Sequence, residues 1–522
     1  ADKMSWQRGR HSLQLGGELT FVRGKRRDQQ TEPALPFGLV TGDPAGGLFT
    51  TTNFPDASDA SLADARFLYA LLTGRVASVT TEMGLDAATN QYVINGPTDR
   101  RSHQHEIGLF VQDSFRAAPN LTLNVGLRYE LQLPLQADLN VWSANTIADA
   151  CGVSGMGQGP GGRPCNFFMP GTLTGITPVY EQYQAGTTRY KTDWNNLAPS
   201  VGVAWLPGVE TGPLRGLLGD PDQATIRAAY ARAFIRDGLG RFGQPYEVNP
   251  GPSFDAVRSV PNGNLGEPPV LLREPGRLGP GDFPQTPLYP LAINRGSGVN
   301  LFDTKWEVGF ADSFSVGIQR ALSRDTAVEV RYVGTRGRNL VEIENWNELN
   351  LVENGFLDEF KTAQANLYAN VAAGRGETIA YAGEGTGTSP LPTYLAYFNG
   401  SRNASDPRAY TGGRWTDPQT LGRFARLNPN PTLSALDLHG NGGFRTNALR
   451  AGVPANFFVL NPDVTPVNVH VSKGSTRYDA LQVELRRRLS RGLAVNASYA
   501  YVKAWTSRLD SLRVDRALVP AL

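Results

Sequence analysis

The stretch "SHQHE" at residues 102–106 contains the residue types of a metal site. On a β-strand His103 and His105 would share a face, because alternate side chains point the same way. Imidazole and carboxylate groups are common zinc ligands, but a tetrahedral site needs four ligands, and we find no third and fourth partner. We interpret the stretch as the solvated end of a strand and expect no metal site.

A second stretch, "GLGRFG" at 238–243, matches the GxGxxG pattern of dinucleotide-binding proteins. That fingerprint needs a helix directly after the glycines to direct its N-terminus at the pyrophosphate. The "QPYEVNPGPSF" that follows is predicted not to be helical, so we expect no cofactor. The sequence has no GxSxG elbow, HExxH helix or paired-carboxylate signature, and we expect no enzymatic activity.

The two cysteines, Cys151 and Cys165, bracket the glycine-rich loop "CGVSGMGQGPGGRPC". A disulfide between them would stabilise the fold by about 3 kcal/mol in the chain-entropy model and would indicate an oxidising compartment. Two unpaired thiols are the alternative. We favour the disulfide.

The composition of the 522-residue chain excludes two classes of protein. Hydrophobic residues make up 40%, mean hydropathy is -0.30, and no run of about 18 apolar residues could form a transmembrane helix. The first ten residues also lack the layout of a signal peptide. The 50 Lys and Arg residues are interleaved with 48 Asp and Glu, so no basic patch indicates a nucleic-acid partner.

The elements around these motifs are strands with strict alternation of apolar and polar residues. A hairpin at 106–130 has two arms of about nine residues, the length that crosses a bilayer as a tilted strand. Similar hairpins occur at 313–334 and 478–502. With single arms starting near His11, Ala198 and Ala224, we predict nine or ten strands, the arm "RVASVTTEMGL" being the least regular.

The connections between the arms alternate between tight turns and long loops. The long loops are predicted at about 24–74, 131–194, 237–305 and 339–475, and they are rich in Gly, Pro, Asn and Asp. Such asymmetry is typical of transmembrane β-barrels, which have short periplasmic turns and long extracellular loops. Aromatic residues toward the arm ends also favour a barrel over the alternative, a soluble β-sandwich.

We therefore predict an all-β fold, an antiparallel transmembrane β-barrel in the outer membrane, with one short loop helix starting at Asp59. The apolar side chains expected to face lipid are Leu121, Leu123, Val125, Leu127, Val328, Val330, Val483 and Val495. The polar side chains expected to line the lumen are Gln112, Asn124, Arg128, Glu130, Glu329, Arg331, Glu484 and Arg486. We expect these lumen residues to contact mainly water and a plug.

Four segments carry a family resemblance: "VQDSFRAAPNLTLNVGLRYE", "NNLAPSVGVAWLP", "PANFFVLNPDV" and "STRYDALQVELRRRLSRGLAVNASYAYVKA". They resemble the barrel segments of TonB-dependent outer-membrane receptors, in particular the Oar-like branch. The resemblance extends from about His11 to Ala504 and is strong in the hairpins and weak in the loops. It implies a Gram-negative outer-membrane barrel of about 22 strands, filled by a plug and powered through the TonB complex.

The sequence departs from that family at both ends. We find no plug domain before His11, no TonB box and no carboxypeptidase-regulatory-like domain, and the final "DRALVPAL" lacks a strand with a terminal aromatic residue. From these departures we expect a barrel fragment, about half of the whole, without its plug and C-terminal strands.

The resemblance implies energy-coupled uptake of a ligand, which could be a carbohydrate, a peptide or a chelate. The expected partners are outer-membrane lipid, the TonB complex through the missing plug, and a small ligand, peptide or glycan at the extracellular loops. The alternative is an adhesion or structural barrel whose loops bind surface or matrix partners. A secreted glycan-binding sandwich is a third interpretation.

Overall fold

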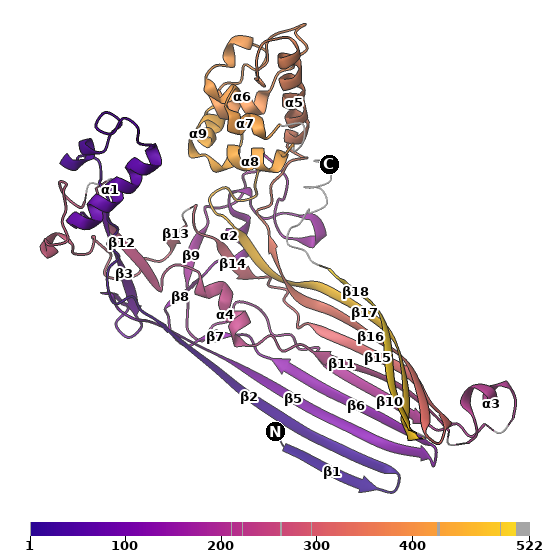
Figure 1. Ribbon diagram of the computed structural model, residues 1–522. Coiled ribbons are helices and arrows are strands. Elements are labelled where there is room, and N and C mark those ends of the chain that lie inside the picture. The colour runs from indigo at the N-terminus through magenta and orange to yellow at the C-terminus, as the bar shows by residue number, and fades with distance from the viewer. Residues whose placement is uncertain are drawn as a thin grey trace.

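The computed structural model describes residues 2–507, except 210, 222, 261–263, 294, 425–428 and 491. Its main element is a twisted sheet of ten long strands, each hydrogen-bonded antiparallel to the next (Figure 1). The strands are β1 (Asp2–Arg8), β2 (His11–Asp28), β5 (Thr98–Ala118), β6 (Leu121–Gln132), β10 (Leu197–Trp205), β11 (Ala224–Phe234), β15 (Phe310–Ser323), β16 (Thr326–Asn345), β17 (Val467–Ser490) and β18 (Leu493–Thr506). The predicted antiparallel architecture is confirmed, and the sheet is open, with β1 and β18 at its edges.

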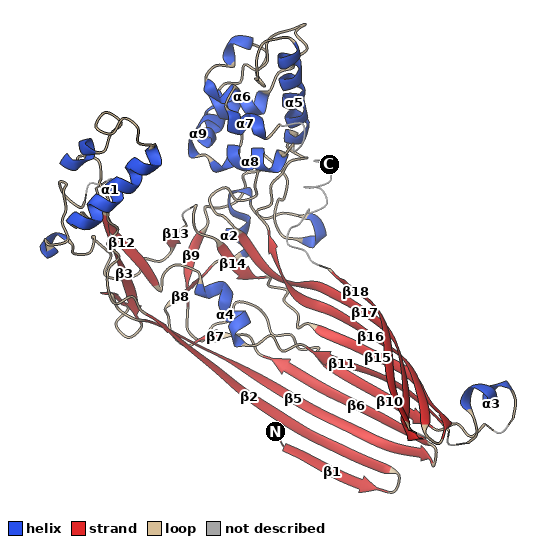
Figure 2. Ribbon diagram, in the orientation of Figure 1, coloured by secondary structure: helices blue, strands red, loops and turns tan. Residues whose placement is uncertain are grey.

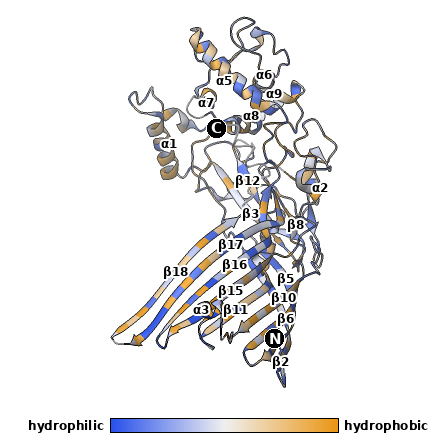
Figure 3. Ribbon diagram, turned by 90° about the vertical axis from the view of Figure 1, so that its right-hand side faces the viewer, coloured by the Kyte–Doolittle hydropathy of each residue, from blue (hydrophilic) through white to orange (hydrophobic). Residues whose placement is uncertain are grey.

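The register keeps apolar and polar side chains on opposite faces across the whole sheet. Leu123 lies opposite Phe115 on one side and Val203 on the other. Its neighbour Asn124 lies opposite Ser114 and Gly202, on the other face. Followed from strand to strand, the register places all eight residues expected to face lipid on one face and all eight expected to line the lumen on the other. Figure 3 shows the same alternation as colour bands along the strands.

Short turns join the strands at one end of the sheet, and long connections join them at the other. The turns include 9–10, 119–120 and 324–325, and the link between β10 and β11 contains α3 (Pro213–Leu218). The long connections are 29–97, 133–196, 235–309 and 346–466. The first is longer than predicted, because "RVASVTTEMGL" forms β3 outside the barrel sheet. The fourth is shorter, because β16 and β17 extend beyond the bilayer-length arms. The segment "DRALVPAL" lies outside the described residues.

The long connections contain more regular structure than the one predicted loop helix. Two small sheets form there, β12 (Ser253–Ser259) with β3 (Ser78–Asp86) and β4 (Gln91–Ile94), and β13 (Leu291–Ala292) with β9 (Val179–Tyr183) and β8 (Trp142–Ala144). β14 (Val299–Phe302) pairs in parallel with β17, and β7 (Gln136–Ala137) pairs with β5. Short 3-10 helices occupy Pro44–Leu48, Gly152–Ser154, Pro160–Gly162, Pro275–Arg277, Pro407–Ala409 and Gly413–Trp415.

The helix expected from Asp59 is α1 (Asp59–Thr73). It begins where the Ser58 side chain accepts a hydrogen bond from the Ser61 amide, and it ends at Gly74, whose φ of 66° is a left-handed conformation that favours glycine. None of the described helices is both long and apolar enough to cross a membrane.

The connection 346–466 forms a helical unit that the sequence analysis did not predict (Figure 2). Its helices are α5 (Phe356–Ala372), α6 (Pro392–Asn399), α7 (Pro418–Gly422), α8 (Pro431–Gly440) and α9 (Gly442–Arg450). They enclose an aromatic core in which Phe356, Tyr394, Phe424 and Phe458 are fully buried. Aromatic side chains bury large apolar areas, so this core stabilises the unit.

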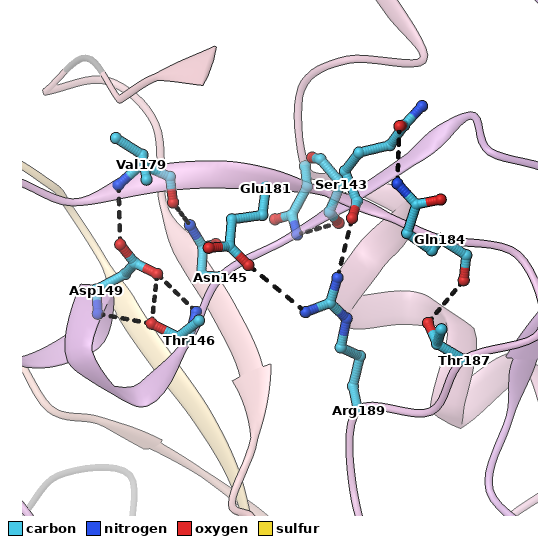
Figure 4. A network of polar contacts seen from close by, with 11 residues as sticks. Ser143, Asn145, Thr146, Asp149, Val179, Glu181, Gln184, Thr187 and Arg189 are labelled. Carbon is cyan, nitrogen blue, oxygen red and sulfur yellow. Dashed lines mark hydrogen bonds and ion pairs between the residues drawn. The ribbon is translucent and has the colours of Figure 1, made fainter. Parts of the chain in front are cut away.

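A network of polar contacts fixes the connection 133–196 (Figure 4). Thr146 and Asp149 form a capping box at the start of α2 (Ile147–Cys151), and the Asp149 carboxylate also accepts from the Val179 amide at 3.0 Å. Asn145 donates to the Val179 carbonyl at 2.8 Å. These contacts tie α2 to β9, and so give a loop with little regular structure a defined shape.

Candidate binding site on the polar face

The segment 235–247 folds over the polar face of the sheet at the end with the long connections. Gln132 donates to the Ile235 carbonyl at 2.8 Å, and Arg236 forms an ion pair with Glu106 at 2.6 Å. The segment then forms α4 (Leu239–Glu247), whose last residue pairs with Arg26 of β2 at 2.8 Å. Residues 235–247 thus cover the polar ends of β2, β5 and β6, although they lie far from these strands in the sequence. We call this segment the roof.

This helix corrects one sequence-based expectation. Residues 244–247 of "QPYEVNPGPSF" are helical, with Pro245 inside α4, and two glycines of the GxGxxG match lie within the helix after its N-cap, Gly238. Phe242 and Tyr246 on α4 are almost completely buried among the aromatic side chains of the loops. Burial of these rings outweighs the low helix propensity of proline and glycine. The motif therefore does not form the turn before a helix that a dinucleotide fingerprint requires.

A polar cavity of about 180 Å³ lies under this roof. Its lining includes Glu18, Glu106, Arg128, Glu130 and Arg236. Arg128 contacts Glu130 closely and Glu18 at 3.7 Å, so both cations of the cavity are engaged by carboxylates. Glu106 Oε1 is buried and has no hydrogen-bond partner among the described residues. Three carboxylates against two guanidinium groups suit a ligand that donates hydrogen bonds, such as a polyol or an amine.

Four other predicted lumen residues gather at the opposite side of the sheet. Glu329, Arg331 and Glu484 line a second polar cavity of about 250 Å³ between β16, β17 and β18. Arg331 donates to Gln482 at 2.5 Å, and Arg486 pairs with Glu484 at 2.6 Å. These pairs keep the charges satisfied on a face that is open to solvent.

The remaining predicted lumen residues lie nearer the short turns and away from both cavities. Gln112 donates to Gln14 at 3.3 Å, and Asn124 lies exposed opposite Gly202. Sequence reasoning missed Glu18 and Arg236 of the first cavity. The alternation of β2 could have indicated Glu18, whereas Arg236 lies after the end of β11 and reaches the cavity only through the fold.

The two histidines of "SHQHE" share a face, but Glu106 points to the opposite one. Their rings stack at 4.9 Å, and His103 Nδ1 contacts Asp138 at 2.5 Å. In the part of the chain that the structure describes, no group of three or more His, Cys, Asp or Glu side chains is arranged to bind a metal ion. The pair lies on the face of β5 that carries its apolar side chains.

Cys151 and Cys165 form a disulfide with 5.3 Å between their Cα atoms. Both residues are completely buried in a core with Phe167, Trp346 and Val469. The disulfide loop therefore packs near the end of β16 and the beginning of β17.

Comparison with known proteins places this arrangement in a family. Residues 1–515 match the model of the outer membrane beta barrel domain. The chain belongs to this family. As an outer membrane beta barrel domain it lies in the outer membrane and contacts lipid, and the expected location is confirmed. No curated protein matches the chain.

Several solved structures are similar to this beta barrel domain. They include the outer membrane transporter YddB from Escherichia coli (7% identity, TM-score 0.35, 96% of this chain and 32% of that chain). The ferric-catecholate import receptor Fiu from E. coli (9%, 0.30, 97% and 37%) and the FrpB iron transporter from Neisseria meningitidis (8%, 0.31, 97% and 36%) are further examples. The chain spans about a third of the length of these structures.

Proposed function

We propose that this domain is part of a TonB-dependent transporter of the Oar-like type, which takes up an extracellular ligand without a catalytic step. The observation that carries the proposal is the roofed polar cavity at Glu106, Arg128 and Arg236. A polar cavity covered by an ordered segment can hold a polar ligand on the lumen side before the ligand passes inward.

In this mechanism the loops capture the ligand and the cavity accepts it below α4. The mixed charges on the rest of the polar face, such as Arg331 and Glu484, bind water or a plug. TonB would act on the plug to open the path. The polar lining favours a hydroxyl-rich or amine-bearing ligand, a carbohydrate or a peptide, over an apolar one.

The test compares cells that carry the full-length gene with cells that lack it. Mass spectrometry of the culture medium measures which solutes are depleted, with and without a protonophore. We expect at least one carbohydrate or peptide to be depleted only in energised cells that carry the gene. Equal depletion in all cultures would contradict transport.

A matched pair of variants links the uptake to the cavity. Glu106→Gln keeps the size of the side chain but removes the charge that pairs with Arg236, and it should reduce uptake. Glu377→Gln, an exposed position on the helical unit, is the control and should leave uptake unchanged.

Adhesion is the second candidate, in which the long loops, including the helical unit at 346–466, would bind surface or matrix partners. Asn350 donates to the Phe458 carbonyl at 2.6 Å, so the two ends of the unit lie together, and a short linker can replace residues 352–457. A shortened protein that transports normally but no longer supports cell attachment would assign adhesion to this unit. Loss of uptake with normal attachment would support ligand capture.

A further inference from the structure

The ends of β2 and β5 carry a group of basic side chains on the apolar face of the sheet. We call Arg23, Lys25, Arg27, Arg101, His103 and His105 the rim cluster. They follow directly after the exposed apolar residues Leu19 and Phe21 on β2, and they precede Ile107 and Leu109 on β5. The cluster therefore lies just beyond the apolar band, at the end of the sheet with the long connections.

The register places two like charges directly opposite each other, because Lys25 lies across from Arg101. Arg27 lies across from Asp99, and Arg23 lies across from the imidazole of His103. Like charges at opposite positions of an antiparallel pair destabilise a sheet. This arrangement becomes favourable when an anion lies between the side chains.

The carboxylates around the cluster only partly neutralise it. Asp99 is shared by Lys25 and Arg27 at 3.9 Å each and by Arg101 at 3.4 Å. Asp138 is engaged by His103. Among the described residues Arg23 forms no ion pair, and it lines a cavity of about 690 Å³ with Lys25, Arg101 and both histidines.

The opposite face of the same strands is different. There Arg26 pairs with Asp28 and Glu247 at 2.8 Å each, and Arg100 pairs with Asp28 at 2.5 Å. On that face, Arg26 and Arg100, which lie level with the rim cluster, are therefore both paired closely with a carboxylate. The charge deficit is therefore confined to the face that carries the lipid-facing residues.

Protection of an edge strand does not explain the cluster. Cationic side chains often prevent pairing at an exposed edge of a sheet. However, Arg101 lies on β5, which pairs with β2 on one side and with β7 on the other. A free edge cannot account for cations on an interior strand.

We propose that the rim cluster binds the phosphate groups of a phosphorylated lipid in the outer leaflet. The acyl chains would lie against Leu19, Phe21 and Leu109, and the phosphates would lie between Arg23, Lys25 and Arg101. Guanidinium and ammonium groups bind phosphate through charge-assisted hydrogen bonds. The proposal depends on the apolar face being the lipid-facing one, which the Leu123 variants described in the Discussion test separately.

The experiment measures lipid binding to the purified full-length gene product in neutral detergent by native mass spectrometry. The probes are bis-phosphorylated lipid A, its dephosphorylated form, and inorganic phosphate at the same concentration. We expect only the phosphorylated lipid to bind, and we expect Arg23→Gln with Lys25→Gln and Arg101→Gln to weaken its binding about tenfold or more. Arg324→Gln, in the turn at the opposite end of the sheet, is the matched control and should bind as the unmodified chain does.

Equal binding of the phosphorylated and dephosphorylated lipids would overturn the proposal. Saturation by inorganic phosphate alone would show a site for free phosphate and would overturn the lipid assignment. If the triple variant does not fold, the single variant Arg23→Gln replaces it, because Arg23 forms no ion pair with any residue that the structure describes. An unchanged affinity in a folded Arg23→Gln variant, together with an unchanged salt dependence, would also contradict the proposal.

Discussion

The guanidinium of Arg163 pairs with the carboxylate of Glu344, whose side chain is completely buried. Arg163 Nε lies 2.8 Å from Glu344 Oε2, which also accepts a hydrogen bond from Trp346 Nε1 at 2.9 Å. Arg163 belongs to the disulfide loop, and Glu344 lies near the end of β16. This pair therefore joins the connection 133–196 to the end of β16, directly before the helical unit 346–466.

Removal of one partner from this pair should be strongly destabilising. Glu344→Gln leaves the mostly buried Arg163 without its counter-charge, at an expected cost of about 3–5 kcal/mol. Urea unfolding of the loop region, followed by the fluorescence of the buried tryptophans, measures the change. Glu377→Gln at an exposed position is the control, and an equal effect of both variants would contradict the assignment.

Loss of the disulfide should loosen the same region. Replacement of Cys151 and Cys165 by serine, which opens a loop with a sequence separation of 14, should cost about 3 kcal/mol in the chain-entropy model. Ser154 of this loop accepts a hydrogen bond from Asn456 at 2.9 Å, so hydrogen exchange should rise near both residues. Unchanged exchange at Asn456 would show that the loop does not support the helical unit.

The assigned faces of the sheet can be tested on neighbouring residues. Leu123→Arg places a charge on the apolar face. Such a charge costs about 2–4 kcal/mol at the bilayer midplane and less toward the interfaces, so we expect this variant to impair assembly. Asn124→Arg points the other way, toward the space above Gly202, and should be tolerated. Heat-modifiable migration of the full-length gene product on gels reports assembly. Equal tolerance of the two variants would contradict the facing.

The helical unit should lose stability in mild acid because of His439. Burial, together with the neighbouring Arg295 and Arg445, lowers the pKa of His439 to about 3. Below pH 6.5 the unfolded chain takes up a proton that the folded unit does not bind until about pH 3. The free energy of unfolding should therefore fall as pH decreases through this window, by up to about 1.4 kcal/mol per pH unit.

Hydrogen exchange of α8 and α9, corrected for the intrinsic rate at each pH, measures this effect. His439→Gln removes the titrating group and should make the stability of these helices less dependent on pH between 6.5 and 4. Identical pH profiles for the two proteins would rule out His439 as the cause. At pH 8 the histidine is neutral in both states, so that comparison isolates the effect of the substitution itself.

The sequence by itself determined the strands and their two faces. Alternation is a local property, because every second side chain of a strand points the same way. In an antiparallel sheet, residues that lie opposite each other on neighbouring strands share a face, so the assignment extends from strand to strand. For this reason Leu123 and Asn124 could be assigned to opposite faces before their partners were known. The start of α1 at Asp59 could likewise be predicted, because a helix end depends on a few adjacent residues.

Only the tertiary structure decided how the loops fold and which residues meet. Pro245 and the nearby glycines argue against a helix, yet burial of Phe242 and Tyr246 among residues from other loops stabilises α4. The cavity depends on Glu106 and Arg236, which are 130 positions apart, and no local pattern predicts such a contact. Local geometry thus fixed the barrel strands, while long-range packing of aromatic and charged side chains built the candidate site.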